Sequence, residues 1–279
     1  MNPKRYRRLT EILQNRLGLI LGEDKRHLVR ERLEPLVAQH GLHSLDDLVA
    51  AIDRPRGDEV LDAIVDTLTS RSTHFFSDPR SLDTLFDYVL PRVLEVRGDE
   101  RPVRIWSAAC AAGEEIHSIG IGLRDRFPEL SSQEIELLGT DLYEAALRRA
   151  DRGEYPRTAV EDHVPSESIE RYFELDRRTA TLRSDVRDSA QFDTLNLLDP
   201  FDHVGRQDVI ICRDVLRYFD PEVQCDVVDR LTRCLQPEGF LVLGSGEGLA
   251  QRPAALRPIP ESETPLFQRA TERDLQSER

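Results

Sequence analysis

After about residue 100 the sequence alternates between short apolar runs and helical stretches. Strands that alternate with helices predict a parallel sheet with right-handed crossovers, which is an α/β fold. Ligands of such sheets bind at the carboxyl ends of the strands. The apolar runs are VRIWSAAC (103–110), IELLGTD (135–141), QDVIICRD (207–214) and GFLVLGSGEG (239–248), and the helical stretches are AGEEIHSIGIGLRDRF, LYEAALRRADRG and PEVQCDVVDRLTRCL. The strand-end rule therefore indicates Ala109–Glu115, Asp141, Asn196 and Arg213–Tyr218 as the ligand-binding positions.

The first 70 residues carry the 3.6-residue period of amphipathic helices and no strand pattern. Gly41 is placed to end one helix, Ser44 is placed to cap the next, and a fourth helix is expected from about Asp58 to Leu68. We therefore expect an all-helical N-terminal domain at 1–70, a linker and first helix at 71–95, and a sheet domain at 96–270.

An insert at about 154–192 breaks the alternation within the sheet domain. Its segment YFELDRRTATLRSDV (172–186) predicts two short strands around a polar turn, as in a small antiparallel β-subdomain. The segment TPLFQRA (264–270) is expected to add one last edge strand, and residues 271–279 are expected to be a disordered tail.

Composition excludes several classes of protein. The chain has 38 Lys and Arg against 52 Asp and Glu, a net charge of −14, which disfavours a free-standing nucleic-acid binder. Residues 1–34 are the exception, with nine basic and five acidic side chains. No run of 18 apolar residues and no secretion signal is present, which predicts a cytoplasmic protein without membrane insertion.

The cysteines and histidines give no metal signature. Cys110, Cys212, Cys225 and Cys234 form no CxxC pair, and the seven histidines lack zinc-ligand spacing. We expect free thiols, most of them buried, and no metal site.

The junction WSAACAAGEEIHS (106–118) is the strongest local signal for a binding site. Its small residues would let a ligand approach the backbone, while Glu114 and Glu115 argue against a phosphate and for a ligand with an ammonium group or hydroxyls. The alternative is that both glutamates only stabilise the first helical turn. Asp141 could likewise hold a ribose diol, cap the next helix, or do both. Arg213 is expected at the carboxyl end of a parallel strand, where an arginine that only packs in the core would be unusual.

Six motifs in order then support a resemblance to a known family. They are STHFFSDP, RIWSAACAAGEEIHS, GTDLYEAALRRADRGEY, FDTLNLLDPF, DVIICRDVLRYFDPEVQ and GFLVLGSGEG. Almost the whole chain resembles the CheR-type chemotaxis receptor methyltransferases, which are protein-glutamate O-methyltransferases. The resemblance implies a Rossmann-like domain that binds S-adenosyl-L-methionine (SAM), an N-terminal all-α domain and an inserted antiparallel subdomain.

The resemblance also implies roles for individual residues. Glu115 matches the acid that meets the amino group of SAM, and Asp141 matches the ribose-binding acid. Tyr218 matches a catalytic tyrosine that faces the reacting methyl group, with Arg213 beside the ligand. The remaining cofactor-binding positions are Thr73 and Ser77 in the linker, Asn196 and Leu197 along the adenine, and Asp214 next to Arg213.

The chain departs from the family pattern at several polar positions. The linker motif Asn-x-Thr-x-Phe-Phe-Arg is here Arg71 to Ser77, so that Ser77 replaces the arginine, with Arg71 and Arg80 as nearby candidates to substitute for it. Asp214 stands where the family usually has asparagine. These departures motivate an alternative function, a regulatory module that binds SAM or its product S-adenosylhomocysteine (SAH) with little or no turnover.

The resemblance implies a partner, a chemoreceptor-like helical protein rather than a nucleic acid. Basic residues of the N-terminal domain would meet its acidic helices, although charges of this kind are also typical of a solvated helix face. No feature of the insert predicts docking of a receptor's C-terminal pentapeptide. The substrate-binding candidates are Lys25, Arg26, Arg30 and Arg32.

Overall fold

The computed structural model describes residues 2–17, 21–23, 26–69, 74–97, 101–130 and 134–271. The chain divides into two compact units, Met1–Ser72 with Tyr218–Asp220, and Thr73–Arg217 with Pro221–Arg279. Each unit is described by itself.

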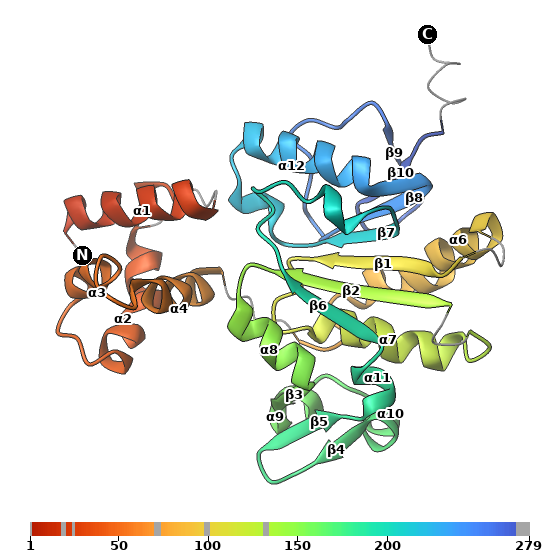
Figure 1. Ribbon diagram of the computed structural model, residues 1–279, viewed down its shortest axis with the longest axis horizontal. Helices are drawn as coiled ribbons and strands as arrows, with labels where there is room; N and C mark the ends of the chain where they lie inside the picture. Colours follow the sequence, from red (N-terminus) through yellow and green to blue (C-terminus); the bar gives the residue numbers. More distant parts are fainter. Residues whose placement is uncertain are drawn as a thin grey trace. The chain divides into compact units, whose positions relative to one another are not determined.

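The N-terminal unit is a small helical bundle (Figure 1). Its apolar positions recur at helical spacing, so that Tyr6, Leu9 and Leu13 are all buried. The side chain of Ser44 accepts a 3.1 Å hydrogen bond from the backbone amide of Asp47, which confirms the predicted cap. The helices are α1 (Pro3–Leu17), α2 (Arg26–Gln39), α3 (Leu45–Ala51) and α4 (Gly57–Thr69).

The second unit contains a seven-stranded sheet with the order β6-β2-β1-β7-β8-β10-β9 (Figure 1). Its first five strands are parallel, as the alternating pattern predicted, whereas β10 runs antiparallel to both neighbours. The carboxyl ends of β1, β2 and β7 therefore meet at one edge of the sheet. The strands are β1 (Val103–Ala108), β2 (Ile135–Asp141), β6 (Ala190–Thr194), β7 (Gln207–Cys212), β8 (Leu235–Leu243), β9 (Leu256–Pro258) and β10 (Leu266–Arg269).

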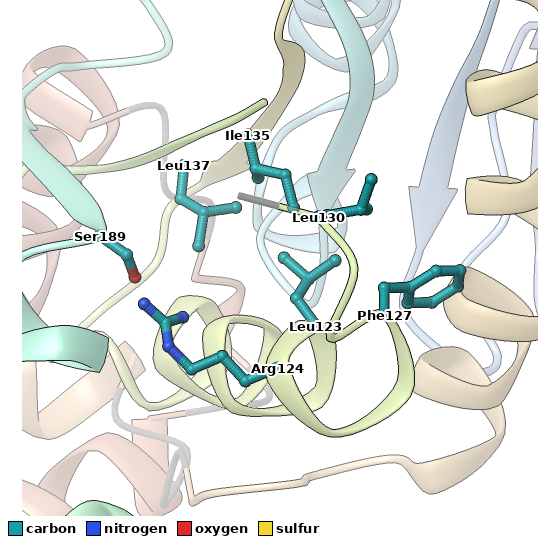
Figure 2. A pocket seen from close by; sticks show the side chains of 7 residues that line it. All are labelled: Leu123, Arg124, Phe127, Leu130, Ile135, Leu137 and Ser189. Atoms are coloured by element: carbon teal, nitrogen blue, oxygen red, sulfur yellow. The ribbon is translucent and has the colours of Figure 1, made fainter. Parts of the chain in front are cut away.

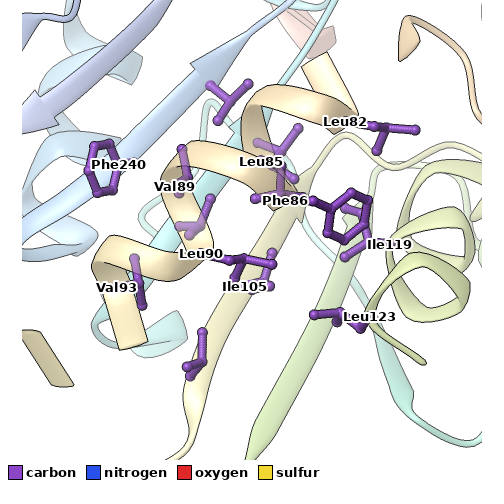
Figure 3. Packing of buried hydrophobic residues seen from close by; sticks show 14 of the residues in the cluster. Leu82, Leu85, Phe86, Val89, Leu90, Val93, Ile105, Ile119, Leu123 and Phe240 are labelled. Carbon is purple, nitrogen blue, oxygen red and sulfur yellow. The ribbon is translucent and has the colours of Figure 1, made fainter. Parts of the chain in front are cut away.

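Helices pack on this sheet and bury its apolar side chains. One hydrophobic core joins the segment after the linker to β1, β8 and α7, with Phe86, Val89 and Ile105 almost wholly buried (Figure 3). α7 and α8 contact β2 and β6, and α12 contacts β8. The elements are α5 (Pro79–Asp83), the π-helical turn η2 (Thr84–Val89), α6 (Leu90–Arg97), α7 (Glu114–Arg126), α8 (Glu144–Arg152), η3 (Asp202–Val204), η4 (Leu216–Tyr218) and α12 (Pro221–Cys234).

The insert forms a separate three-stranded antiparallel sheet with the order β3-β5-β4. Its strands β4 (Phe173–Leu175) and β5 (Thr179–Leu182) are the predicted hairpin, whereas β3 (Glu154–Pro156) was not expected. Three short helices complete it, namely α9 (Arg157–Glu161), α10 (Ser166–Tyr172) and α11 (Ser184–Arg187). β6 already belongs to the main sheet, so the small sheet itself ends at Leu182.

The expected position of the last strand was wrong. β10, within TPLFQRA, lies between β8 and β9, and β9 takes the edge of the sheet. β9 has only three residues and includes Pro258, which pairs with Phe267. Proline lacks a backbone N–H and is confined to edge strands, which explains why a proline-rich segment can occupy this edge and no inner position.

All four cysteines are free thiols. Cys110, Cys212 and Cys234 are buried, and Cys225 on α12 is half-buried. Burial raises the pKa of the Cys110 and Cys212 thiols well above the usual range. The predicted tail from residue 272 onward lies outside the described residues.

Candidate functional site

The loop between β1 and α7 lies at the carboxyl end of β1 and has a constrained backbone. Ala109, Ala111 and Gly113 all have positive φ, at 65°, 51° and 86°. A left-handed backbone costs a residue with a Cβ roughly 1–2 kcal/mol, and such strain is concentrated at functional sites. A Cβ on Gly113 would lie 2.6 Å from the Cβ of Ala150, so this position also requires glycine for space.

Hydrogen bonds fix this loop from two sides. The amide of Ala111 donates to Oδ2 of Asp141 at 2.8 Å. The hydroxyl of Tyr155, on β3 of the insert, donates to the carbonyl oxygen of Ala112 at 2.9 Å. Burial raises the pKa of Tyr155 well above its usual range, so this hydroxyl remains a donor. The insert therefore helps to shape the loop that leads to Glu115.

Glu115 and Arg213 form an ion pair between the first turn of α7 and the end of β7. Nη1 of Arg213 lies 2.8 Å from Oε2 of Glu115, and both side chains are at least 85% buried, with 10% and 15% of their surface exposed. The hydroxyl of Ser107 donates to the other carboxylate oxygen of Glu115 at 2.7 Å. The buried Nε of Arg213 has no hydrogen-bond partner among the described residues, which leaves a donor for the carboxylate of a ligand.

The segment before α5 approaches the same arginine. The carbonyl oxygen of Ser77 lies 3.4 Å from Nη1 of Arg213, and Oδ2 of Asp78 lies 3.6 Å from its Nη2. Ser245 donates to Oδ2 of Asp78 at 2.6 Å. Arg80, one candidate to replace the family's linker arginine, is exposed and lies 3.4 Å from Glu263. Arg213 is thus held by one carbonyl and two carboxylates.

Asp141 and Asn196 lie at the ends of neighbouring parallel strands, since Asp141 is in register with Thr194. Asp141 is 7% exposed and accepts backbone hydrogen bonds on both oxygens, from Ala111 and, at 3.0 Å, from Tyr143. A carboxylate offers about four acceptor sites, so these bonds are compatible with further hydroxyl donors. Leu197 is buried, and Oδ1 of Asn196 accepts from Leu198 at 3.0 Å.

Asp214 and Glu247 meet at the ends of β7 and β8. The amide of Asp214 donates to Oε2 of Glu247 at 2.7 Å, and Gly244 donates to the same oxygen at 2.9 Å. Burial raises the pKa of both carboxyl groups, opposed at Asp214 by the charge of Arg213 and at Glu247 by these two backbone bonds.

The structure brings together Ser77, Glu115, Arg213 and Asp214, and separately places Asp141 beside Asn196 and Leu197. The remaining predicted site residues belong to the unit of the N-terminal helices or lie outside the described ranges. Tyr218 ends η4 and belongs to the unit of the N-terminal helices. Arg32 donates to the carbonyl oxygen of Leu68 at 2.9 Å, Arg30 lies 3.8 Å from Glu34, and Arg26 lies 5.9 Å from the ring of Tyr6. Thr73 and Lys25 lie outside the described residues.

Sequence reasoning missed several contributors. Glu247 follows β8 in the motif GFLVLGSGEG, so applying the strand-end rule to this strand would have found it. Asp78 precedes Pro79, a helix-start signal, but nothing in the sequence shows that it reaches Arg213. Tyr155 gave no signal, because its partner is a backbone carbonyl 43 residues away.

A cavity of about 110 Å³ lies at the other end of β2, where the strand begins (Figure 2). Ligand pockets usually reach about 300 Å³ or more, so this one is small. It is mostly apolar, with Arg124 and Ser189 as its polar side chains (Figure 2). Because it is lined by Ile135 and by the last turn of α7, it is separate from the strand-end site.

Within the described ranges, no helix is both long and apolar enough to cross a membrane. The same part of the chain contains no cluster of three or more His, Cys, Asp or Glu side chains suited to a metal ion.

A parallel sheet with a constrained loop and acidic side chains at its strand ends defines the class of Rossmann-like nucleoside-binding domains. The comparisons with known proteins specify the family. Residues 71–264 match the family described as "CheR methyltransferase, SAM binding domain", and residues 4–69 match "CheR methyltransferase, all-alpha domain". The chain belongs to the CheR methyltransferase family, and its second unit is a SAM-binding domain.

Relatives with similar overall length support this membership. "Chemotaxis protein methyltransferase 1" of Pseudomonas aeruginosa is 34% identical over 246 residues, covering 86% of this chain and 89% of that protein. "Chemotaxis protein methyltransferase" of Vibrio parahaemolyticus is 33% identical over 253 residues, covering 89% and 90%.

Solved structures resemble the chain more distantly. PKMT2 from Rickettsia typhi in complex with AdoHcy has 16% identity and a TM-score of 0.36, covering 62% of this chain and 26% of that one. TrmN from Thermus thermophilus has 14% identity and a TM-score of 0.38, covering 64% and 47%.

Proposed function

We propose that this protein transfers the methyl group of SAM to glutamate carboxylates of a chemoreceptor-like helical protein. The observation that carries the proposal is the buried Glu115–Arg213 pair at the strand ends of a chain that matches both CheR family domains in order. The names of the chemotaxis methyltransferase relatives support the same function.

The amino-acid end of SAM fits this pair. It carries an ammonium and a carboxylate, and the pair offers a carboxylate and a guanidinium with an unpartnered Nε donor. We assign Glu115 to the ammonium and Arg213 to the carboxylate. Asp141 would accept from the ribose hydroxyls, and Asn196 and Leu197 would lie along the adenine.

The chemistry then needs positioning more than acid–base catalysis. SAM supplies a methyl group on a positively charged sulfur, the glutamate oxygen bonds to the methyl carbon, and the sulfur retains the electron pair of the broken bond. A glutamate is already ionised at neutral pH, so no strong general base is required. The residues of this chain would hold the two reactants in line. They would also exclude water from the reacting atoms, where the positive charge of the sulfonium is neutralised. Tyr218 is our candidate for the group facing the methyl.

A second candidate function is a regulatory SAM- or SAH-binding module with little turnover. It is favoured by Ser77, which is uncharged where the family has arginine, and by Arg80, which lies beside Glu263 instead of at Arg213. The other candidate to replace that arginine, Arg71, lies outside the described residues. For both functions we propose a protein partner and a cytoplasmic location. We propose no nucleic-acid partner and no docking of a receptor's C-terminal pentapeptide.

One experiment separates the two. The purified protein is incubated with methyl-labelled SAM and the signalling domains of receptors from the same organism, and base-labile methyl esters are counted. Glu115→Gln is the test variant, and Glu144→Gln, at an exposed position on α8 paired with Arg148, is the matched control. Methyl esters formed by the wild-type protein, and reduced about tenfold or more in Glu115→Gln, support the enzyme function. The size of this reduction is expected because charged hydrogen bonds contribute about 1.5–3 kcal/mol. SAM binding without any label would favour the module.

A further inference from the structure

The strand-end site carries more negative than positive charge beside Arg213. Four carboxylates surround two guanidinium groups at the ends of β1, β7 and β8. Five of these six side chains are at least partly buried, whereas Arg217 is exposed, at 39%. The acids are Asp78, Glu115, Asp214 and Glu247, and the bases are Arg213 and Arg217.

SAM would balance part of this charge in a definite way. If Glu115 and Arg213 take the ammonium and the carboxylate of the amino-acid end, their own charges are matched. Asp78, Asp214 and Glu247 then face Arg217 alone, an excess of two negative charges. The remaining charge on SAM is its sulfonium, and SAH lacks that charge.

Asp214 and Glu247 lie close together, because a side-chain oxygen of each approaches Gly244 at the end of β8. A Cβ built on Gly244 would lie 2.9 Å from Oδ1 of Asp214 and also 2.9 Å from Oε2 of Glu247. Oε1 of Glu247 is buried and has no hydrogen-bond partner among the described residues. A buried carboxylate oxygen without a partner is costly, and a nearby cation lowers that cost.

The pKa values of both carboxyl groups are raised, so the folded protein penalises their ionised forms. Burial raises the pKa of Asp214, Arg213 opposes this, and Asp78 adds to it. Burial also raises the pKa of Glu247, with Asp214 adding to it and Arg217 opposing. A cation placed between the two carboxylates would favour their ionised forms.

We propose that Asp214, together with Glu247, makes the site prefer the positively charged sulfonium of SAM over the neutral thioether of SAH. The inference rests on the proposed SAM site and goes beyond it, because it assigns a ligand preference to a residue at which this chain departs from the family's asparagine. A site with this preference releases its product readily after each methyl transfer.

The backbone makes Asp214→Asn a suitable test. Asp214 has a φ of 64°, in the left-handed region that Asn and Asp tolerate best among residues with a side chain. The substitution therefore retains the backbone conformation and the size of the side chain, and it removes one charge. Asp229→Asn on α12 is the matched control, an exposed acid outside the site that loses the same charge.

Calorimetric titration with SAM and with SAH gives the affinity ratio for each protein. For Asp214→Asn we expect the SAM-to-SAH affinity ratio to fall about fivefold or more, because charges a few ångströms apart interact appreciably even at an effective dielectric constant near 20. Asp229→Asn should leave the ratio unchanged. An equal ratio in wild type and Asp214→Asn would overturn the inference while leaving the SAM site intact. A wild-type protein that binds neither ligand would instead overturn the proposed function.

A second measurement uses only the wild-type protein and covers the case in which Asp214→Asn does not fold. Titrations at mildly acidic pH, in two buffers of different ionisation enthalpy, count the protons released on binding. The sulfonium should favour the ionised carboxylates, so SAM should release more protons than SAH. Equal proton release for the two ligands would overturn the inference.

Discussion

The hydroxyl of Tyr155 donates a 2.9 Å hydrogen bond to the carbonyl oxygen of Ala112, and this bond links the inserted subdomain to the loop before α7. Both ends are at least nine-tenths buried, so the bond has no water to replace it. The insert therefore directly supports the loop that leads to Glu115, the residue proposed to bind the ammonium group of SAM.

Tyr155→Phe should destabilise the protein and weaken SAM binding together. It leaves a buried carbonyl unsatisfied, which costs about 1–3 kcal/mol and corresponds to roughly 2–4 °C of melting temperature per kcal/mol in a domain of this size. Thermal unfolding and calorimetry measure both effects. Tyr88→Phe, which removes the hydroxyl of a partly buried tyrosine outside the loop, is the control. A normal SAM affinity in Tyr155→Phe would show that the loop keeps its shape without this bond.

Asp141→Ala should weaken SAM and SAH by at least about tenfold and by the same factor, because the ribose is common to both ligands and a lost charged hydrogen-bond acceptor costs about 1.5–3 kcal/mol. Calorimetric titration with each ligand tests this. The result contrasts with Asp214→Asn, for which only the SAM affinity should fall. Unchanged affinity for both ligands would exclude Asp141 from the binding site.

Tyr218→Phe should lower turnover more than binding if the hydroxyl acts at the reacting methyl group. Methyl-ester formation at saturating SAM gives the first quantity and calorimetry the second. Parallel losses in the two would indicate a packing role for the tyrosine.

Arg30→Ala should raise the KM for the receptor substrate several-fold without changing SAM affinity, because exposed charges act mainly on the encounter with a partner. Arg30 is exposed, and its contact with Glu34 is weak at 3.8 Å. Arg56→Ala is the control, an exposed arginine of the same unit with a 2.9 Å contact to Glu59. Arg32→Ala should instead lower the melting temperature, since Arg32 donates to the carbonyl oxygen of Leu68. An unaltered receptor KM in Arg30→Ala would remove that residue from the partner surface.

The buried His117 should make the stability of the protein depend on pH. Burial lowers its pKa from 6.5 to about 4, and its Nε2 bonds to the carbonyl oxygen of Ala150 at 3.0 Å. The folded protein therefore holds this histidine neutral, and it contributes stability above pH 6.5 that is lost as the pH falls toward 4, up to about 3 kcal/mol. His117→Gln retains an amide donor and cannot titrate, so urea unfolding between pH 7 and 4 should show a smaller loss of stability. An identical loss in both proteins would contradict this assignment.

The features that could be predicted from the sequence are the elements with a periodic apolar pattern and the residues at the ends of the predicted strands. The parallel sheet, the four N-terminal helices and the hairpin of the insert were all predicted from local patterns, and the strand-end rule indicated Glu115, Asp141 and Arg213 before any family resemblance. Contacts between distant segments could not be predicted. Asp78 reaches Arg213 from 135 residues away in the chain, and the short strand β9 depends on an edge position that only the folded sheet provides.

Two further features were not predicted from the sequence. π-Helical pairing in η2 is a rare variation that no periodicity signals. The motif GFLVLGSGEG was recognised as part of the family pattern, but the approach of its Glu247 to Asp214 depends on the parallel register of β7 and β8.

The arrangement of the thiols has a practical consequence. Cys110, Cys212 and Cys234 are enclosed by the fold, which leaves Cys225 on α12 as the cysteine best placed to react with a maleimide reagent. A fluorophore attached there would report on the native protein without mutagenesis. Because α12 carries none of the proposed ligand contacts, such a label would leave the chemistry of the strand ends undisturbed.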